Sequence, residues 1–125
     1  MKNKNFIKSL GHAFAGIREA AAQERNFRFQ IIIGILAILA CIILQVEAFL
    51  FVLVSFAVFF VLAMELVNTA VEAIVDLLTA GKKHPLAKIA KDVSAGAVLI
   101  AGAVFTIVLL KKKGGRGKPD ESGIE

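Results

Sequence analysis

The sequence predicts an all-helical integral membrane protein, and three observations support this fold class. The hydrophobic fraction is 58% and the mean hydropathy is +0.77. The apolar residues are concentrated in long runs, whereas soluble chains spread a smaller apolar share by periodicity. Basic residues flank these runs, as they do in membrane-spanning helices. At 125 residues the chain is one domain by length. We expect an interfacial amphipathic helix at about 3–26, spans at about 29–45, 48–78 and 86–110, and a disordered basic and polar tail at 111–125.

The net charge of +5 raises the question of a nucleic-acid partner. The basic residues lie beside apolar segments, where anionic lipid headgroups and membrane topology explain them better. We therefore expect the bilayer, and no nucleic acid, as the partner of these charges. The single cysteine, Cys41, lies inside an apolar run and has no second cysteine with which to pair. It is predicted to be a packing residue.

The segment from Met1 to about Arg28 has apolar residues at steps of three and four, among basic residues. This pattern is typical of a helix that lies in the membrane interface. The competing interpretation, a cleaved signal peptide, requires an unbroken apolar core, which His12, Arg18 and Glu19 interrupt. The spacing from Gly11 to Gly16 resembles a phosphate loop, but Ile17-Arg18 replaces the required lysine and hydroxyl residue and no strand precedes it.

The first two spans are predicted to form an antiparallel pair. The apolar run from Phe29 to Leu44 is near the shortest length that crosses a core of about 30 Å. The polar break at 45–47 follows at once, and a helix then continues from Ala48 to Leu78 without Gly or Pro. At about 1.5 Å per residue, about twenty residues of this second helix cross the bilayer and end near Val67.

The third span is predicted to begin after a break at 81–85. Gly81 ends one helix, and Pro85 suits the first turn of the next. His84, between them, could cap the new helix or act as a ligand or base. Small residues occupy much of the third span and would let another backbone approach closely, so this helix is expected at the centre of a bundle. These small residues are Ser94, Ala95, Gly96, Ala97, Ala101, Gly102 and Ala103.

The orientation follows from the basic flanks. The N-terminal segment and the basic loop 82–91 fall on one side of a three-span protein, and the positive-inside rule makes that side the cytoplasm. The protein is then a multi-pass cell-membrane protein with its N-terminus in the cytoplasm and its C-terminus outside. The lysines at 111–113 lie outside against the rule, but two basic flanks outweigh one.

An acidic stripe follows the second span. On one helix, Glu65, Glu72 and Asp76 project within about 40° of one another, with Asn68 beside them. Carboxylates at the edge of hydrocarbon are costly and usually have a function. The alternative interpretation is a helix that becomes polar simply because it emerges into water.

The carboxylates, Asn and lysine expected on the cytoplasmic side favour binding of Mg²⁺ together with phosphate groups. Carboxylates with an Asn suit Mg²⁺, which binds through one or two carboxylates, waters and substrate phosphates, and a lysine suits phosphate charge. A carboxylate at the hydrocarbon edge could then accept a proton from a lipid hydroxyl. The alternative is a non-enzymatic scaffold, or a channel or transporter subunit with a cation pathway. That alternative needs polar groups through the hydrocarbon, where the chain offers little beyond Gln45, Ser55 and Thr106.

Two motifs carry a family resemblance. The run Glu65-x-x-Asn68-Thr69-Ala70-x-Glu72-x-x-x-Asp76 and the run Ala90-Lys91-Asp92-x-x-Ala95-Gly96-Ala97-Val98-Leu99 occur with Gly16-Ile17 and Gln23-Glu24-Arg25-Asn26. Together they resemble the small bacterial diacylglycerol kinase and undecaprenol kinase family, over about residues 6–110. The resemblance implies an interfacial helix plus three membrane helices per protomer and a homotrimer with shared active sites. It also implies phosphorylation of a membrane lipid alcohol, diacylglycerol or undecaprenol, that depends on ATP and Mg²⁺.

The resemblance also implies roles for single residues. Glu65 would be the general base on the lipid hydroxyl, and Asn68 would orient the site. Glu24 and Glu72 would hold the metal together with the phosphates. The nucleotide would be bound by Gly16, Glu24, Glu72, Asp76, Lys91 and Asp92. The segment 24–26 and the loop 84–92 resemble the undecaprenol kinase branch more than the diacylglycerol kinase branch.

Overall fold

The computed structural model describes residues 2–116, with side chains from residue 4 to residue 111. The described chain consists of four helices: α1 (Lys2–Gln23), α2 (Arg25–Ile43), α3 (Ala48–Thr79) and α4 (Pro85–Arg116). No strand occurs between residues 2 and 116, which confirms the predicted all-helical class. Three apolar segments are long enough to cross a membrane, at Arg25–Ile43, Ala48–Thr79 and Pro85–Lys111.

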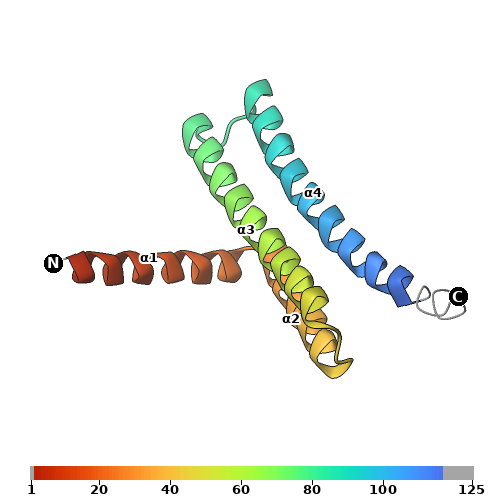
Figure 1. The fold of residues 1–125 in the computed structure, drawn as a ribbon. Helices are drawn as coiled ribbons and strands as arrows, with labels where there is room; N and C mark the ends of the chain where they lie inside the picture. The colour runs from red at the N-terminus through yellow and green to blue at the C-terminus, as the bar shows by residue number, and fades with distance from the viewer. Residues whose placement is uncertain (1, 117–125) are drawn as a thin grey trace, which may run out of the picture.

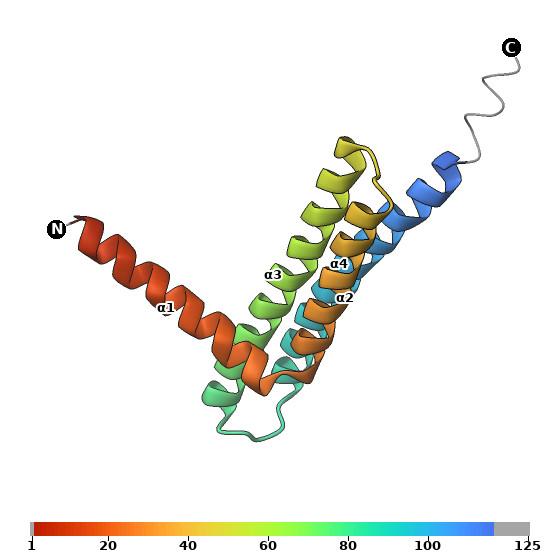
Figure 2. The same cartoon turned by 90° about the horizontal axis from the view of Figure 1, so that it is seen from below.

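Helix α1 projects sideways from the other helices, which run together (Figures 1 and 2). Its apolar side chains are exposed, from 41% at Ile17 to 67% at Phe6. Of its described side chains, only that of Ala20, close to the junction with α2, is buried. A helix that leaves its apolar stripe uncovered in this way suits the headgroup layer, where lipid covers the stripe.

The break between α1 and α2 has a local cause in Glu24 and Arg28. The backbone of Glu24 is extended, with φ −106° and ψ 110°, so the helix changes direction there. The Nη1 atom of Arg28 donates to the carbonyl oxygens of Ala21 and Ala22 at 2.9 and 3.0 Å. Because the last carbonyls of a helix lack partners within the helix, these bonds stabilise the end of α1. The junction places Glu24 beside the bundle.

Helices α2 and α3 form the antiparallel pair that the polar break predicted, and they enclose the small core. Gln45 turns the chain with a φ of +54°. The buried side chains of Cys41, Val54 and Val58 form the centre of the core, so the prediction that Cys41 is a packing residue is confirmed. Partly buried residues packed around them are Ala37, Ile38, Val46, Leu50, Phe51, Leu62, Phe105 and Val108.

The closest approach of α2 to α3 is at Gly34, and it leads to a prediction about stability. A Cβ atom on Gly34 would lie 2.6 Å from Cγ1 of Val58. We expect Gly34→Ala to lower the free energy of unfolding in detergent by about 1–3 kcal/mol, because β-branched Val58 has little freedom to move aside. Denaturant titration of the purified protein measures this loss.

Two further variants test the cause of that loss. Gly11→Ala is the matched control, since a Cβ there meets nothing within 4 Å. Adding Val58→Ala to Gly34→Ala should recover part of the stability, because it removes the clashing methyl groups. If Gly34→Ala is as stable as Gly11→Ala, the contact with Val58 is not tight.

The turn between α3 and α4 follows the predicted pattern of Gly and Pro. Ala80 and Gly81 adopt left-handed conformations, with φ values of 53° and 77°, and the N–H of Gly81 donates to the carbonyl of Asp76 at 3.1 Å. Helix α4 then begins at Pro85. The Nδ1 atom of His84 accepts a hydrogen bond from the N–H of Leu86 at 3.1 Å, so His84 caps the first turn of α4.

The structure differs from the sequence-based expectations in two places. Residues 111–116, expected in the disordered tail, continue α4 to Arg116; lysine is a good helix former, and positive charge at a helix C-terminus is favourable. The remainder of the predicted tail, 117–125, lies outside the described residues. Within the single chain α3, and not α4, is central, because α3 contacts the other three helices whereas the small residues Gly96 and Gly102 of α4 face open space.

Candidate functional site

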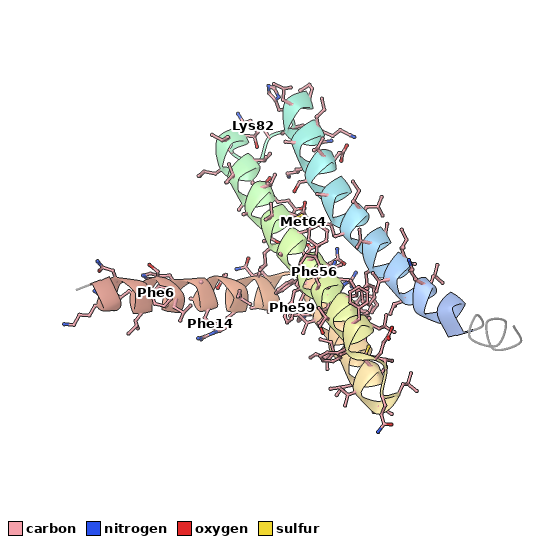
Figure 3. The ribbon with its side chains drawn as sticks, viewed as in Figure 1. Phe6, Phe14, Phe56, Phe59, Met64 and Lys82 are labelled. Carbon is pink, nitrogen blue, oxygen red and sulfur yellow. The ribbon has the colours of Figure 1, made fainter. Side chains whose placement is uncertain are left out.

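The most buried ionisable side chain described is that of Glu65, which is 3% exposed. It accepts a hydrogen bond from Nε2 of Gln30, in the second turn of α2, at 3.2 Å. Glu65 lies about 26 Å along α3 from Ala48, so a helix that crosses a core of about 30 Å would place it near one end of the hydrocarbon. Figure 3 shows the neighbouring Met64 between the apolar Phe56 and Phe59 and the loop residue Lys82. The structure thus holds a buried carboxylate, paired with the amide of Gln30, in the apolar part of α3.

One turn further along α3, Asn68 connects Glu65 to the polar part of the helix. Asn68 is 7% exposed, and its Nδ2 makes a long hydrogen bond of 3.5 Å to Glu72. Its buried Oδ1 accepts no hydrogen bond from any described group. A buried polar atom without a partner is costly, so Asn68 is held here with one acceptor unsatisfied.

Negative charge gathers around Glu72. The carboxylates of Glu24 and Glu65 lie close enough to repel the charge of Glu72, while Lys91 attracts it. The α1–α2 junction therefore brings Glu24 to the acidic stripe of α3. Side chains that repel one another in this way are stabilised when a cation binds between them.

The donor set fits Mg²⁺ held together with a nucleotide. Between residues 4 and 111, no group of three or more His, Cys, Asp or Glu side chains is arranged to hold a metal by itself. Mg²⁺ does not require such a group, because it usually binds through one or two carboxylates, substrate phosphates and water. Glu24 and Glu72 are two carboxylates that could contribute to such a site, and Oδ1 of Asn68 is an acceptor without a partner on the same helix as Glu72.

A second part of the site lies beyond Glu72, where α3 meets α4. Nζ of Lys91 donates to Oδ1 of Asp76 at 2.7 Å and ties the two helices together. Asp92 pairs instead with Lys88, at 2.7 Å, on the same helix. These side chains line a hollow of about 490 Å³ together with Lys82, Lys83 and His84. A hollow lined by lysines suits the phosphates of a nucleotide.

The structure brings most of the site residues that were predicted from the sequence to the same end of α3 and its neighbours. Glu24 and Glu65 lie within electrostatic range of Glu72, Asn68 makes a hydrogen bond to Glu72, and Asp76, Lys91 and Asp92 line the hollow further along α3. Gly16 is the exception: it lies on α1, with nothing within 4 Å of the position that a Cβ would take.

Sequence reasoning missed Gln30, which it included in the first apolar span. The available signal was a lone amide side chain in an apolar run, one turn after the polar pair Arg25-Asn26. That pattern does not indicate which residue Gln30 contacts. The contact with Glu65, 35 residues away, depends on how α2 is rotated against α3.

Fold and site together define a class: a helical membrane protein with a group of acidic side chains on a membrane-length helix. Residues 11–111 match the sequence profile of prokaryotic diacylglycerol kinase, so the chain belongs to the prokaryotic diacylglycerol kinase family. The chain is 41% identical over 104 residues to the diacylglycerol kinase of Synechocystis sp., covering 83% of this chain and 59% of that protein.

Two other relatives are covered over most of their length. The chain is 37% identical to the undecaprenol kinase of Bacillus subtilis, and the aligned region covers 82% of this chain and 83% of that protein. It is also 37% identical to the diacylglycerol kinase of Escherichia coli, over 81% of this chain and 82% of that protein. The undecaprenol kinase of Bacillus subtilis and the diacylglycerol kinase of Escherichia coli are thus equally similar to this chain.

Proposed function

We propose that the protein transfers the γ-phosphate of ATP, bound with Mg²⁺, to the hydroxyl of a membrane lipid alcohol at the cytoplasmic face. The observation that carries this proposal is the buried carboxylate of Glu65 on α3, the helix that further along contributes Asp76 to a hollow of about 490 Å³ lined mainly by charged side chains, lysines among them. A site that joins lipid to water in this way suits a reaction between a lipid and a soluble nucleotide. The relatives, which are diacylglycerol and undecaprenol kinases, support the same reaction class.

In the proposed reaction Glu65 is the general base. Its carboxylate takes the proton of the lipid O–H as the alcohol oxygen forms a bond to the γ-phosphorus. The bond from that phosphorus to the bridging oxygen of the β-phosphate breaks, and ADP leaves with this electron pair. Gln30 holds the carboxylate in place through its N–H. Burial excludes water, which would otherwise compete with the lipid for the phosphoryl group.

The other predicted residues act on the nucleotide. Glu24 and Glu72 would hold the metal, and Asn68 would orient the site through its free Oδ1. When bound, Mg²⁺ neutralises phosphate charge. Asp76, Lys91 and Asp92 would position the phosphates in the hollow. Gly16 on α1 remains a proposal from the family resemblance.

The proposed assembly is a homotrimer with sites shared between subunits. One observation supports a partner helix: α4 leaves open space around Gly96, and a small residue on a membrane helix allows a neighbouring helix to pack closely there. The proposed orientation puts the N-terminus and the α3–α4 loop in the cytoplasm. The end of α4 then lies outside, because α4 runs back from that loop alongside α3 (Figure 2).

The proposed lipid is diacylglycerol or undecaprenol, and we favour undecaprenol. The segment 24–26 and the loop 84–92 support this preference by their resemblance to that branch. The test offers both alcohols in parallel to the purified protein, with ATP radiolabelled at the γ-position. Preferred labelling of undecaprenol supports the preference, and preferred labelling of diacylglycerol contradicts it.

Lys91 gives a prediction about ATP. We expect Lys91→Met to raise the KM for ATP about tenfold, because removing one phosphate contact of a charged group costs about 1.4 kcal/mol. Stability should change by less than about 1 kcal/mol, because the pair with Asp76 is exposed. Steady-state kinetics with saturating lipid provides the test.

The matched control for Lys91 is Lys8→Met, which removes an exposed lysine on α1. It should leave the KM for ATP unchanged. If Lys91→Met has the same KM as this control, Lys91 does not contact the phosphates.

A further inference from the structure

The end of α4 carries a positively charged segment that the proposed function does not use. Four of the six residues 111–116 are basic, namely Lys111, Lys112, Lys113 and Arg116. Helix α4 continues through all six residues to Arg116. These charges therefore belong to the membrane-length helix itself and follow its apolar part without a break. We call residues 111–116 the basic end of α4.

The basic end begins where the apolar part of α4 stops. From Val93 to Leu110 the sequence contains no charged residue, and these 18 residues of helix span about 27 Å. Because the hydrocarbon core is about 30 Å thick, a membrane-crossing α4 would place Lys111 at its edge. Six more helical residues add about 9 Å, which is enough to cross a headgroup layer. The basic end is thus matched in position and in length to lipid headgroups.

The described residues do not neutralise this charge. Along α4 the nearest carboxylate is that of Asp92, about 28 Å before Lys111. Helix α4 ends on the same side of the bundle as the α2–α3 turn, which carries the single carboxylate of Glu47 (Figures 1 and 2). Lys111 is exposed, and it forms no ion pair with any described carboxylate. The C-terminus of a helix offsets only about half of one charge, so the basic end attracts anions from its surroundings.

We propose that the basic end of α4 binds the headgroups of anionic phospholipids in the leaflet away from Glu65 and Glu72. Each Lys or Arg near a membrane surface contributes about 1 kcal/mol of attraction to anionic lipids. The competing anions are the acidic residues of the chain's own segment 117–125. Residues 111–125 nevertheless contain five basic residues and three acidic ones, so pairing within the chain leaves positive charge unmatched.

A tryptophan reporter tests the inference, because the sequence contains no Trp. Leu110→Trp places the reporter next to the basic end, and Leu44→Trp is its matched control beside the α2–α3 turn; both leucines are exposed. Each protein is reconstituted into mixtures of phosphatidylcholine with brominated chains and unbrominated phosphatidylglycerol. Relief of quenching measures how strongly phosphatidylglycerol displaces phosphatidylcholine around each reporter. We expect at least about a fivefold preference for phosphatidylglycerol at position 110, as 1 kcal/mol implies, and less than about twofold at position 44.

Charge variants and salt identify the cause of the preference. Changing Lys111, Lys112 and Lys113 together to Gln should remove the preference at position 110. Lys4→Gln with Lys8→Gln removes two exposed lysines of α1, which joins α2 at the end opposite the α2–α3 turn, and should leave the preference unchanged. Raising NaCl from about 0.1 to about 1 M should weaken the preference without any further substitution, because it shortens the Debye length from about 10 to about 3 Å.

Three results would overturn the inference. The first is an equal preference at positions 110 and 44, and the second is a preference that survives the loss of the three lysines. The third is a Leu110→Trp protein that shows no preference until Asp120→Asn and Glu121→Gln are added, which would make the chain's own acidic residues the partner of the basic end. Because neither ATP nor a lipid alcohol is present, these results are independent of the proposed function.

Discussion

Glu65→Gln should lower the turnover number for lipid phosphorylation at least about a hundredfold, as expected when a general base is lost. The amide keeps the size of the side chain but cannot accept the hydroxyl proton. Because Glu65 is 3% exposed and has Gln30 as its neighbour, the variant should fold as the parent does. The KM for ATP should stay within about twofold, since the proposed nucleotide contacts are side chains further along α3 and on α4. Steady-state kinetics in mixed micelles measures both constants.

The matched control is Glu47→Gln, which removes an exposed carboxylate just before the other end of α3. Its turnover should equal that of the parent. Parent-like turnover in Glu65→Gln would show that another group, or none, removes the proton. A fall in turnover together with a large rise in the KM for ATP would assign Glu65 to nucleotide binding instead.

Glu72→Gln should raise the Mg²⁺ concentration for half-maximal activity at least about tenfold, because ligand charge sets the affinity of an oxygen site for a divalent cation. The same change should not reduce stability. Glu72 is repelled by Glu24 and Glu65, so removing its charge relieves repulsion in the absence of metal. Opposite effects on metal affinity and on stability are expected of a ligand and not of a structural residue. Magnesium titrations of activity and denaturant titrations without metal measure the two effects.

Glu19→Gln is the control for this second prediction, since Glu19 is an exposed carboxylate on α1. It should change neither the magnesium requirement nor the stability. If Glu72→Gln destabilises the metal-free protein and leaves the magnesium requirement unchanged, Glu72 supports the fold and does not hold the metal.

Much of the fold could be predicted from patterns that act locally. Long apolar runs predicted the membrane-length helices. Gly81 and Pro85 predicted the break between α3 and α4, because glycine readily adopts a positive φ and proline cannot continue a helix from the preceding turn. The acidic stripe followed from helical periodicity, which requires only that α3 continue without a break from Ala48 to Thr79.

The contacts between helices could not be predicted in the same way. The bond from Gln30 to Glu65 depends on how α2 is rotated against α3, and no local pattern determines that rotation. The end of α1 is stabilised by Arg28, whose side chain reaches back six and seven residues to the carbonyls of Ala22 and Ala21. From the sequence alone, the positive charge of Arg28 indicated only a contact with lipid headgroups. The position of Glu24 near Glu72 follows from this junction.

The most direct test of the proposed function is transfer of radiolabel from the γ-phosphate of ATP to lipid by the purified protein in liposomes. Undecaprenol and diacylglycerol would each be offered with Mg²⁺ and, separately, with EDTA. We expect labelled lipid phosphate from at least one alcohol with Mg²⁺, none with EDTA, and none from Glu65→Gln. Release of free phosphate without labelled lipid, or labelled lipid formed equally well by Glu65→Gln, would contradict the assignment of this acidic site to lipid phosphorylation.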